Sequence, residues 1–298
     1  MSAKPLIALA ALALLGARPP HHELIPNPDK VAAFLKACDQ KDGWRDPAPP
    51  LQIDRNVYLV GTCGINVLLI SSPQGHVLID SAEEEAVPQI IANVRALGFN
   101  PRDIKWLLTS HSHFDHAGGL AAMQASTNAK IAALPAQARE LRQGAPMEDD
   151  PQFGAIKGIH AVQVDRELQD GVPLLIGPNR ITPFATPGHT AGSTSYVIRG
   201  CGLRNCQALT YADSTSAISA GAYRFADHPA WVAQFRKGVA RIATLPCTVL
   251  ITPHPSSSEL FERLAGDAPL ADKAQCKRYS ELALARLDER LAKEAAAK

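Results

Sequence analysis

The chain has 298 residues, of which 46% are hydrophobic and 20% charged, close to the averages of globular proteins, which excludes a collagen, a coiled coil or a wholly disordered chain. Its formal net charge is only +1, so no basic surface is expected for nucleic acid or for an acidic membrane. We therefore expect a small or locally recognised ligand, and one large domain or two modest ones.

The N-terminus has the layout of a secretory signal peptide. A positively charged end at residues 1–4 precedes an apolar run at 6–15, and the small residues Gly16 and Ala17 follow. This run is too short for a membrane-spanning helix, which needs about 20 residues. We expect residues 1–18 to be removed on export to the periplasm, leaving a mature protein without a membrane anchor. The alternative is a buried N-terminal helix.

Strands and helices follow one another in the first half of the chain. Apolar runs between turn residues predict strands at 51–60, 65–71, 76–80, 105–110 and 130–133. Ser81 is expected to cap a helix with acidic residues in its first turn, and Gly98 to end it. Further helices are expected at about 118–125 and 135–143.

The second half repeats this alternation after the segment 144–158, which is rich in Asp, Pro and Gly and predicts a functional loop or a domain boundary. A helix is predicted at 229–245, and strands at 162–164, 172–176, 180–185, 194–199, 207–212 and 248–252. The tail 280–298 should be helical, with Leu282, Leu287 and Leu291 turned inward. We therefore expect two similar sheet-and-helix layers packed face to face.

A dense cluster of metal ligands follows the predicted strand at 105–110. Residues 111–116 read His-Ser-His-Phe-Asp-His, and imidazole with carboxylate suits zinc. While the chain is extended, His111 and His113 point the same way and can hold one ion. After the chain turns, Asp115 and His116 can serve a second. A catalytic zinc has three protein ligands and an open position, so two more ligands are needed.

Two further histidines occupy comparable positions. His189 follows a predicted strand in Thr-Pro-Gly-His-Thr, and His254 follows another in Thr-Pro-His-Pro. Each alone would be interpreted as a structural histidine, but beside residues 111–116 they complete two sets of three. The other histidines have no such surroundings and are interpreted as structural: His21, His22, His76, His160 and His228.

Six cysteines, none in a C-x-x-C pair or beside this cluster, predict disulfides in an exported chain rather than metal or redox chemistry. Six cysteines allow about 15 pairings, so the spacing leaves the connectivity open. Cys201 and Cys206 are the easiest pair to propose, because Gly202 and Asn205 suit a tight loop.

These segments resemble the metallo-β-lactamase superfamily. The resemblance rests on residues 111–119, on Pro-Gly-His-Thr-Ala-Gly-Ser at 187–193, on His254-Pro255, and on Asp80 after an early strand. It extends to subclass B3 of the metallo-β-lactamases, from about Cys38 to the C-terminal helix. Stretches similar to that subclass include Gly43-Trp44, 50–53, 211–214, 245–247 and 252–255.

The resemblance implies an α/β fold in which two mixed β-sheets pack face to face with helices outside, a four-layer αβ/βα sandwich. Residues 19–298 would form this single catalytic domain. The implied ligands of a first zinc are His111, His113 and His189, and those of a second are Asp115, His116 and His254. The implied disulfides are Cys38–Cys63, Cys201–Cys206 and Cys247–Cys276.

The implied activity is hydrolysis of the β-lactam amide bond by a monomer. A hydroxide shared by two zinc ions would attack the carbonyl, and Asp115, the expected catalytic residue, would accept a hydrogen bond from the hydroxide and so orient it. Ser214 and Ser216 would bind the substrate carboxylate, or alternatively their own backbone. Gln152 would flank the groove. Trp44 would form part of its wall or pack in the core.

Asp213 leaves another interpretation open. Many superfamily hydrolases of thioesters or phosphodiesters bridge their metals with an aspartate from a Gly-Asp motif, whereas this chain reads Ala212-Asp213-Ser214. We expect Ser214 to face the metals; if Asp213 bridges them, a lactonase, thioesterase or phosphodiesterase is favoured. A non-catalytic zinc-binding protein is less favoured, because its sites would be closed by four ligands.

Overall fold

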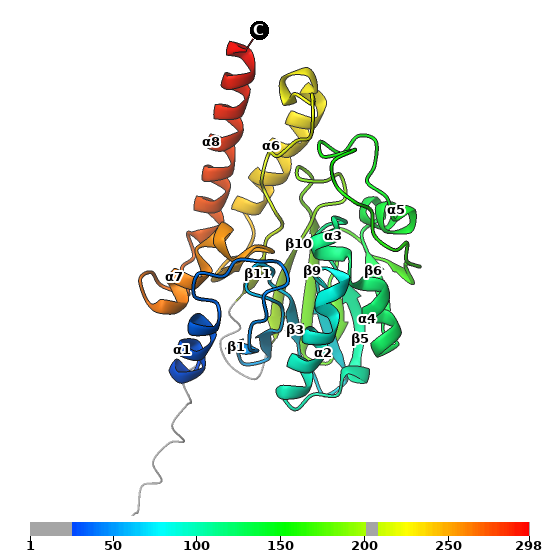
Figure 1. The fold of residues 1–298 in the computed structure, drawn as a ribbon, viewed down its shortest axis with the longest axis vertical. Helices are drawn as coiled ribbons and strands as arrows, with labels where there is room; N and C mark the ends of the chain where they lie inside the picture. The colour runs from blue at the N-terminus through cyan, green and yellow to red at the C-terminus, as the bar shows by residue number, and fades with distance from the viewer. Residues whose placement is uncertain (1–25, 201–207, 298) are drawn as a thin grey trace, which may run out of the picture.

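Two mixed β-sheets form the centre of the protein in the computed structural model, which describes residues 26–200 and 208–297 (Figure 1). In the described residues the first sheet contains, in spatial order, β1 (Leu51–Asp54), β2 (Val57–Leu59), β3 (Leu68–Ile70), β4 (His76–Ile79), β5 (Ile104–Leu108), β6 (Lys130–Ala133) and β7 (Arg166–Glu167). The second contains β12 (Val249–Ile251), β11 (Leu209–Tyr211), β10 (Thr194–Gly200), β9 (Asn179–Ala185) and β8 (Leu174–Ile176).

Helices cover the outer face of each sheet. The α-helices are α1 (Pro28–Ala37), α2 (Val87–Ala96), α3 (Phe114–Ala117), α4 (Leu120–Thr127), α5 (Pro135–Gln143), α6 (Pro229–Ala243), α7 (Leu260–Ala265) and α8 (Gln275–Ala296). Of these, α1 and α7 also pack into the core that the two sheets share. Short 3-10 turns are η1 (Glu84–Ala86), η2 (Pro101–Asp103), η3 (Phe225–Asp227) and η4 (Pro255–Ser258). Within residues 26–200 and 208–297, no helix combines the length and apolar character needed to cross a bilayer. The expected signal segment, 1–18, lies outside the described residues.

Burial of apolar side chains explains the layering. Residues such as Leu68 and Ile79 of the first sheet share one buried core with Ile181 and Tyr196 of the second. The other face of the first sheet is covered by α2, α4 and α5, and that of the second by α6 and α8. The predicted four-layer αβ/βα sandwich is therefore confirmed.

Strand direction brings several strand ends to one edge of each sheet. β4 pairs parallel with β5, and β11 pairs parallel with β12. β9 and β11 both run antiparallel to β10, so β9 points the same way as β11 and β12. Because parallel strands end on the same side, the residues that follow β9, β11 and β12 are neighbours.

The long C-terminal helix packs along α6 (Figure 1). Leu287 of α8 is fully buried with Phe235 of α6, and Leu291 packs partly against the same cluster. The expectation for Leu282 was wrong, since this side chain is 45% exposed. The buried stripe of α8 contains Cys276, Tyr279, Ala283 and Leu287, and Leu282 is turned about 100° from Ala283.

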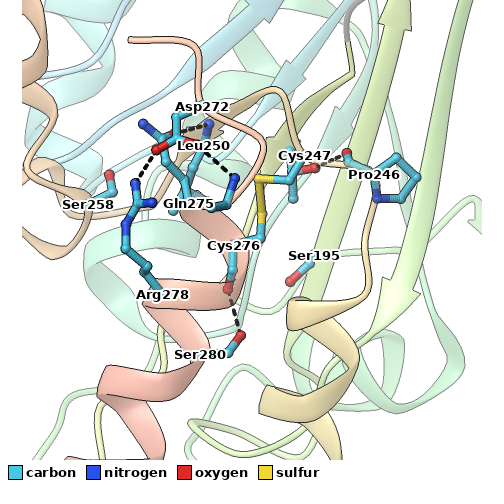
Figure 2. The surroundings of a disulfide bond; sticks show 12 residues. Ser195, Pro246, Cys247, Leu250, Ser258, Asp272, Gln275, Cys276, Arg278 and Ser280 are labelled. Atoms are coloured by element: carbon cyan, nitrogen blue, oxygen red, sulfur yellow. Dashed lines mark hydrogen bonds and ion pairs between the residues drawn. A yellow bond between two sulfur atoms is a disulfide. The ribbon is translucent and has the colours of Figure 1, made fainter. Parts of the chain in front are cut away.

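Two of the three expected disulfides lie in the described residues, and both are present. Cys38 is bonded to Cys63, and Cys247, before β12, to Cys276 in the first turn of α8 (Figure 2). The expected pair Cys201–Cys206 lies outside the described residues. The second bond fastens the start of α8 to the strand that leads to His254.

The predicted strand at 51–60 is a hairpin instead. Leu51 pairs with Leu59 across a turn at Arg55 and Asn56, and the Asp54 side chain accepts the Arg55 N–H at 2.7 Å. A two-residue turn leaves the alternation of buried residues in phase, so the apolar pattern continues through the turn. The sequence pattern therefore could not distinguish one strand from two.

Two further local predictions were wrong. Ser81 does not cap a helix: its hydroxyl donates to the His116 carbonyl at 3.0 Å, and α2 begins only at Val87. Residues 162–164 form no strand, although Val162 and Val164 are buried against the first sheet. Contacts across the fold outweigh local pattern in both places.

Candidate metal centre

The six expected metal ligands follow three strands. His111 and His113 come after β5, and Asp115 and His116 lie in the short helix α3 that starts there. His189 follows β9 and His254 follows β12. The structure brings all six together where the two sheets end.

His111, His113 and His189 form one compact group. Each offers a ring nitrogen within 4.8 Å of the others, and all three are buried. Their ring centroids are 4.7 to 4.8 Å apart. Three imidazoles at this spacing can bind one cation and leave its fourth position open.

Asp115, His116 and His254 form an adjacent group. Asp115 Oδ2 lies 3.0 Å from His116 Nε2 and 3.3 Å from His254 Nε2, and the two Nε2 atoms are 3.2 Å apart. Tetrahedral ligands about 2.0–2.1 Å from zinc are themselves about 3.3 Å apart. His111 also lies within 4.8 Å of the donor atoms of Asp115 and His116, so the two groups are contiguous.

The outward nitrogen of two histidines is held by a carboxylate. His111 Nδ1 lies 2.8 Å from Asp213 Oδ1, and His113 Nε2 lies 2.8 Å from Asp150 Oδ2. A proton on that nitrogen leaves the other nitrogen free to bind a metal. In agreement, His111 Nε2 is buried with no hydrogen-bond partner in the described residues.

Two of the other three histidines follow the same rule. His189 Nδ1 lies 3.1 Å from the Ser216 carbonyl, and His254 Nδ1 lies 3.3 Å from the Gly64 carbonyl. His116 Nδ1 faces Asp80 Oδ2 at an ion-pair distance of 3.3 Å but has no hydrogen-bond partner among the described residues. Metal-binding histidines usually donate their second N–H to a carboxylate or carbonyl in this way. The residues therefore fit a metal cofactor, for a reason independent of the sequence motif.

The pKa shifts of the histidines differ between the two ligand groups. Burial, together with the neighbouring histidines, lowers the pKa of His111 well below its usual value and that of His189 to about 3, so both rings are neutral and able to bind metal at neutral pH. For His116, burial alone would lower the pKa, but Asp115 and Asp80 raise it to about 10. Metal binding at His116 would therefore release a proton.

Asp80 connects the two sheets behind His116. Its carboxylate accepts hydrogen bonds from Thr109, Ser110 and Tyr211, at 2.6 to 3.0 Å. Its backbone has φ of 66°, in the left-handed region that non-glycine residues rarely adopt. Such strain persists only where surrounding contacts hold it, and here they hold an aspartate behind a candidate ligand.

Asp150 was not expected from the sequence to support a ligand. It lies in the segment 144–158, which was expected to be a functional loop or a domain boundary. The contact between Asp150 and His113 favours the functional loop. The only signal was the polar composition of the loop, which does not single out one aspartate among several. Asp150 Oδ1 also accepts the Gln152 N–H at 2.7 Å, so the same carboxylate shapes the loop that carries Gln152.

Asp213 and Ser214 face different partners. The Asp213 carboxylate is buried behind His111, on the ring nitrogen opposite the one that points to the other ligands. Among the described residues, the Ser214 hydroxyl has no hydrogen-bond partner, and Ser214 is slightly exposed. This arrangement favours the expectation that Ser214 lies on the groove side.

The other expected substrate contacts are arranged around the metal ligands. Trp44 is 39% exposed, and its ring centroid lies 5.9 Å from that of His254. Both residues line a cavity of about 450 Å³, which favours a groove wall over core packing for Trp44. The Ser216 hydroxyl lies 3.1 Å from His189 Nδ1, so Ser216 supports a ligand through both its oxygens.

Comparisons with known proteins agree with this geometry. A family model described as the metallo-β-lactamase superfamily matches residues 60–203. The structure is similar to that of the metallo-β-lactamase MIM-1 from Novosphingobium pentaromativorans, with a TM-score of 0.86 and 46% identity over 89% of this chain and 99% of that one. The structure is also similar to that of MEM-A1, a subclass B3 metallo-β-lactamase from a soil metagenome library. The TM-score is 0.82, and the two are 38% identical over 86% of this chain and 100% of that one.

More distant relatives have other names. A hydroxyacylglutathione hydrolase of Brucella anthropi is 26% identical over 82% of this chain and 80% of its own length. The chain spans about half the length of other curated relatives, such as an N-acyl homoserine lactonase of Bacillus cereus, which is 30% identical over 152 residues. The fold, the geometry of the candidate ligands and the alignment over nearly the full length of solved metallo-β-lactamases together define a hydrolase of the metallo-β-lactamase superfamily. The chain belongs to the metallo-β-lactamases, in subclass B3.

Proposed function

We propose that this protein hydrolyses the amide bond of β-lactam antibiotics with the help of two zinc ions. The observation that carries the proposal is the pair of contiguous three-ligand groups, in which each histidine has one ring nitrogen facing a carboxylate or a carbonyl and the other directed inward. Two such groups suit two ions with open positions, which favours catalysis over a closed structural site.

Zinc at these positions makes water nucleophilic at neutral pH and polarises a carbonyl oxygen. His111, His113 and His189 would hold one ion, and Asp115, His116 and His254 the other. Asp115, as the catalytic residue, would also accept a hydrogen bond from the attacking water and so orient it toward the carbonyl carbon.

Substrate binding would depend on the loops around the ligands. The Ser214 hydroxyl is available to donate to the substrate carboxylate, and Ser216 would assist while its carbonyl holds His189. Gln152 would flank the groove, and Trp44, which is 39% exposed, would offer an apolar wall.

Lactone and thioester hydrolysis is the second candidate, because relatives named as lactonases and hydroxyacylglutathione hydrolases match the chain. Against it stands Asp213, whose contact with His111 Nδ1 directs the carboxylate away from the space between the ligands.

Export to the periplasm is part of the same proposal. Residues 1–18 would be a signal peptide, and residues 19–298 a single catalytic domain working as a monomer in the periplasm.

A substrate panel tests the proposal. Metal-free protein is supplied with zinc and assayed on a chromogenic cephalosporin, a homoserine lactone and a glutathione thioester, with zinc content measured in parallel. We expect cephalosporin hydrolysis that a chelator abolishes and zinc restores. Bound zinc with turnover of the lactone or thioester but not the cephalosporin would overturn the substrate assignment.

A further inference from the structure

Helix α5 presents a buried carboxylate to both loops of the first ligand group. Glu140 is only 3% exposed, yet it forms no ion pair within the described part of the chain. Its Oε2 accepts the Ser112 hydroxyl at 2.7 Å, and its Oε1 accepts the Gly192 N–H at 2.6 Å. The Thr190 hydroxyl lies 3.4 Å from Oε2. A buried carboxylate is costly unless its hydrogen bonds are satisfied, and these three donors satisfy it.

Each donor belongs to a segment that carries candidate metal ligands. Ser112 lies between His111 and His113, at the end of β5 in the first sheet. Thr190 directly follows His189, and Gly192 closes the same turn before β10 in the second sheet. One side chain therefore joins the two segments, from different sheets, that supply all three imidazoles of the first group.

Helix α5 and the turn at Gly192 pack so closely that there is no room for a side chain at position 192. A Cβ atom on Gly192 would come within 2.4 Å of Glu140 Oε2 and within 2.6 Å of the Gln137 Cα. On the same helix, Gln137 Nε2 donates to the carbonyls of Thr109 and Ser110, at 2.8 and 3.0 Å. Helix α5 thus holds the β5 end through two side chains and the His189 turn through one.

We propose that Glu140 is a positioning residue for the first metal site, setting the separation between the His111–His113 segment and the His189 turn. This inference rests on the proposed function, because it assumes that these three histidines bind zinc. A carboxylate is suited to this role because its two oxygens accept bonds from both segments at once, whereas an amide has a single acceptor oxygen.

The test measures zinc affinity, which a merely structural residue would not control. Burial raises the pKa of Glu140 to about 7, although the bonds from Ser112 and Gly192 oppose the shift. We therefore compare metal-free wild type and Glu140→Gln at pH 8, by zinc titration against a competing chelator, with unfolding of the metal-free proteins as a check on folding. Glu167→Gln is the matched control, since Glu167 binds α5 through Arg142 on its exposed side, at 2.7 Å.

We expect Glu140→Gln to weaken binding of the tighter zinc about 10-fold or more, within the range for residues that support metal ligands. KM should stay within a few-fold, activity should recover in excess zinc, and the control should bind zinc like wild type. Zinc affinity of Glu140→Gln within 2-fold of wild type would overturn the inference. A wild type that binds no zinc would instead refute the proposed function.

A second variant keeps the inference testable if Glu140→Gln folds poorly. Ser112→Ala removes the bond to the first segment while leaving the helix intact. If Glu140 acts through Ser112, Ser112→Ala alone should weaken zinc binding, and unchanged affinity would contradict the link. Where Glu140→Gln folds, the double variant should lose little more zinc affinity than Glu140→Gln alone. Fully multiplicative losses would show that the two residues act independently and would contradict the proposed link.

Discussion

At the scale of single residues, the centre depends on which nitrogen of each imidazole is kept from the metal. Asp80, Asp150 and Asp213 are carboxylates behind His116, His113 and His111, and backbone carbonyls take the same place behind His189 and His254. Such partners set the tautomer of the ring and raise its basicity. The ligand nitrogens are thus oriented before any cation arrives.

Replacing Asp115 should remove one of the two proposed zinc ions and leave the other. Asp115→Asn removes the negative charge that lies 3.0 and 3.3 Å from His116 and His254. We expect one zinc per chain instead of two, and a loss of at least about 10²-fold in kcat, because orientation of the nucleophile is lost as well. Elemental analysis and steady-state kinetics measure the two effects.

Asp149→Asn is the control for Asp115→Asn, since Asp149 is exposed in the neighbouring loop and should leave both quantities unchanged. Two zinc ions per chain and near wild-type kcat in Asp115→Asn would contradict the role assigned to this carboxylate.

At the scale of elements, α8 supports the site from outside the second sheet. Cys276 in its first turn is bonded to Cys247 (Figure 2), and one turn later the Tyr279 hydroxyl donates to the Asp213 carbonyl at 3.0 Å. Near its C-terminal end, Glu294 accepts the backbone N–H groups of Phe225 and Ala226. The helix thereby holds both ends of the long segment that carries Ser214 and Ser216.

Removal of the Cys247–Cys276 bond should therefore weaken the fold more than the chemistry. The bond closes a loop with a sequence separation of 29 residues. On the chain-entropy account, replacing both cysteines by serine should lower the free energy of unfolding by roughly 3–4 kcal/mol. Denaturant unfolding of zinc-loaded protein measures the loss, and kcat measured well below the unfolding midpoint should change little.

The Cys38–Cys63 bond closes a loop of similar length, with a separation of 25 residues. A variant that lacks it should lose a similar amount of unfolding free energy. If the Cys247–Cys276 variant matched wild type in unfolding, the bond would contribute no measurable constraint on the unfolded chain.

At the scale of the whole molecule, two layered sheets meet at the metal centre, so cation binding joins one to the other. Ligands come from the ends of β5 in one sheet and of β9 and β12 in the other. Any ion that binds only the folded state stabilises it by RT ln(1 + [L]/Kd).

Zinc should accordingly raise the unfolding temperature of the whole chain. With free zinc about 1,000-fold above Kd the gain is about 4 kcal/mol, which corresponds to a rise of several degrees for a chain of this size. Thermal unfolding with and without a chelator measures the shift. Magnesium, which prefers oxygen ligands, should have no comparable effect, and equal shifts with both ions would argue against imidazole ligation.

The ligand chemistry and the class of fold could be predicted from the amino-acid sequence. Residues 111–116 are consecutive, and the turn residues around His189 and His254 are local signals, so short-range geometry and motif were sufficient. The expectation of two sheet-and-helix layers packed face to face followed from the alternation of apolar strands and helices, and the four-layer sandwich from the resemblance to the metallo-β-lactamases. Local pattern failed where two structures share one pattern, as in the hairpin at 51–60, or where a helix boundary depended on a distant carbonyl, as at Ser81.

The residues that stand behind the ligands could be identified only from the packing of the folded chain. Asp150 lies 37 positions from His113, and Asp213 lies 102 positions from His111. Nothing in the chain near Glu140 indicates that it contacts segments of both sheets. These contacts depend on how two sheets and a helix pack together, and packing is set by the sum of many buried contacts rather than by any local run of residues.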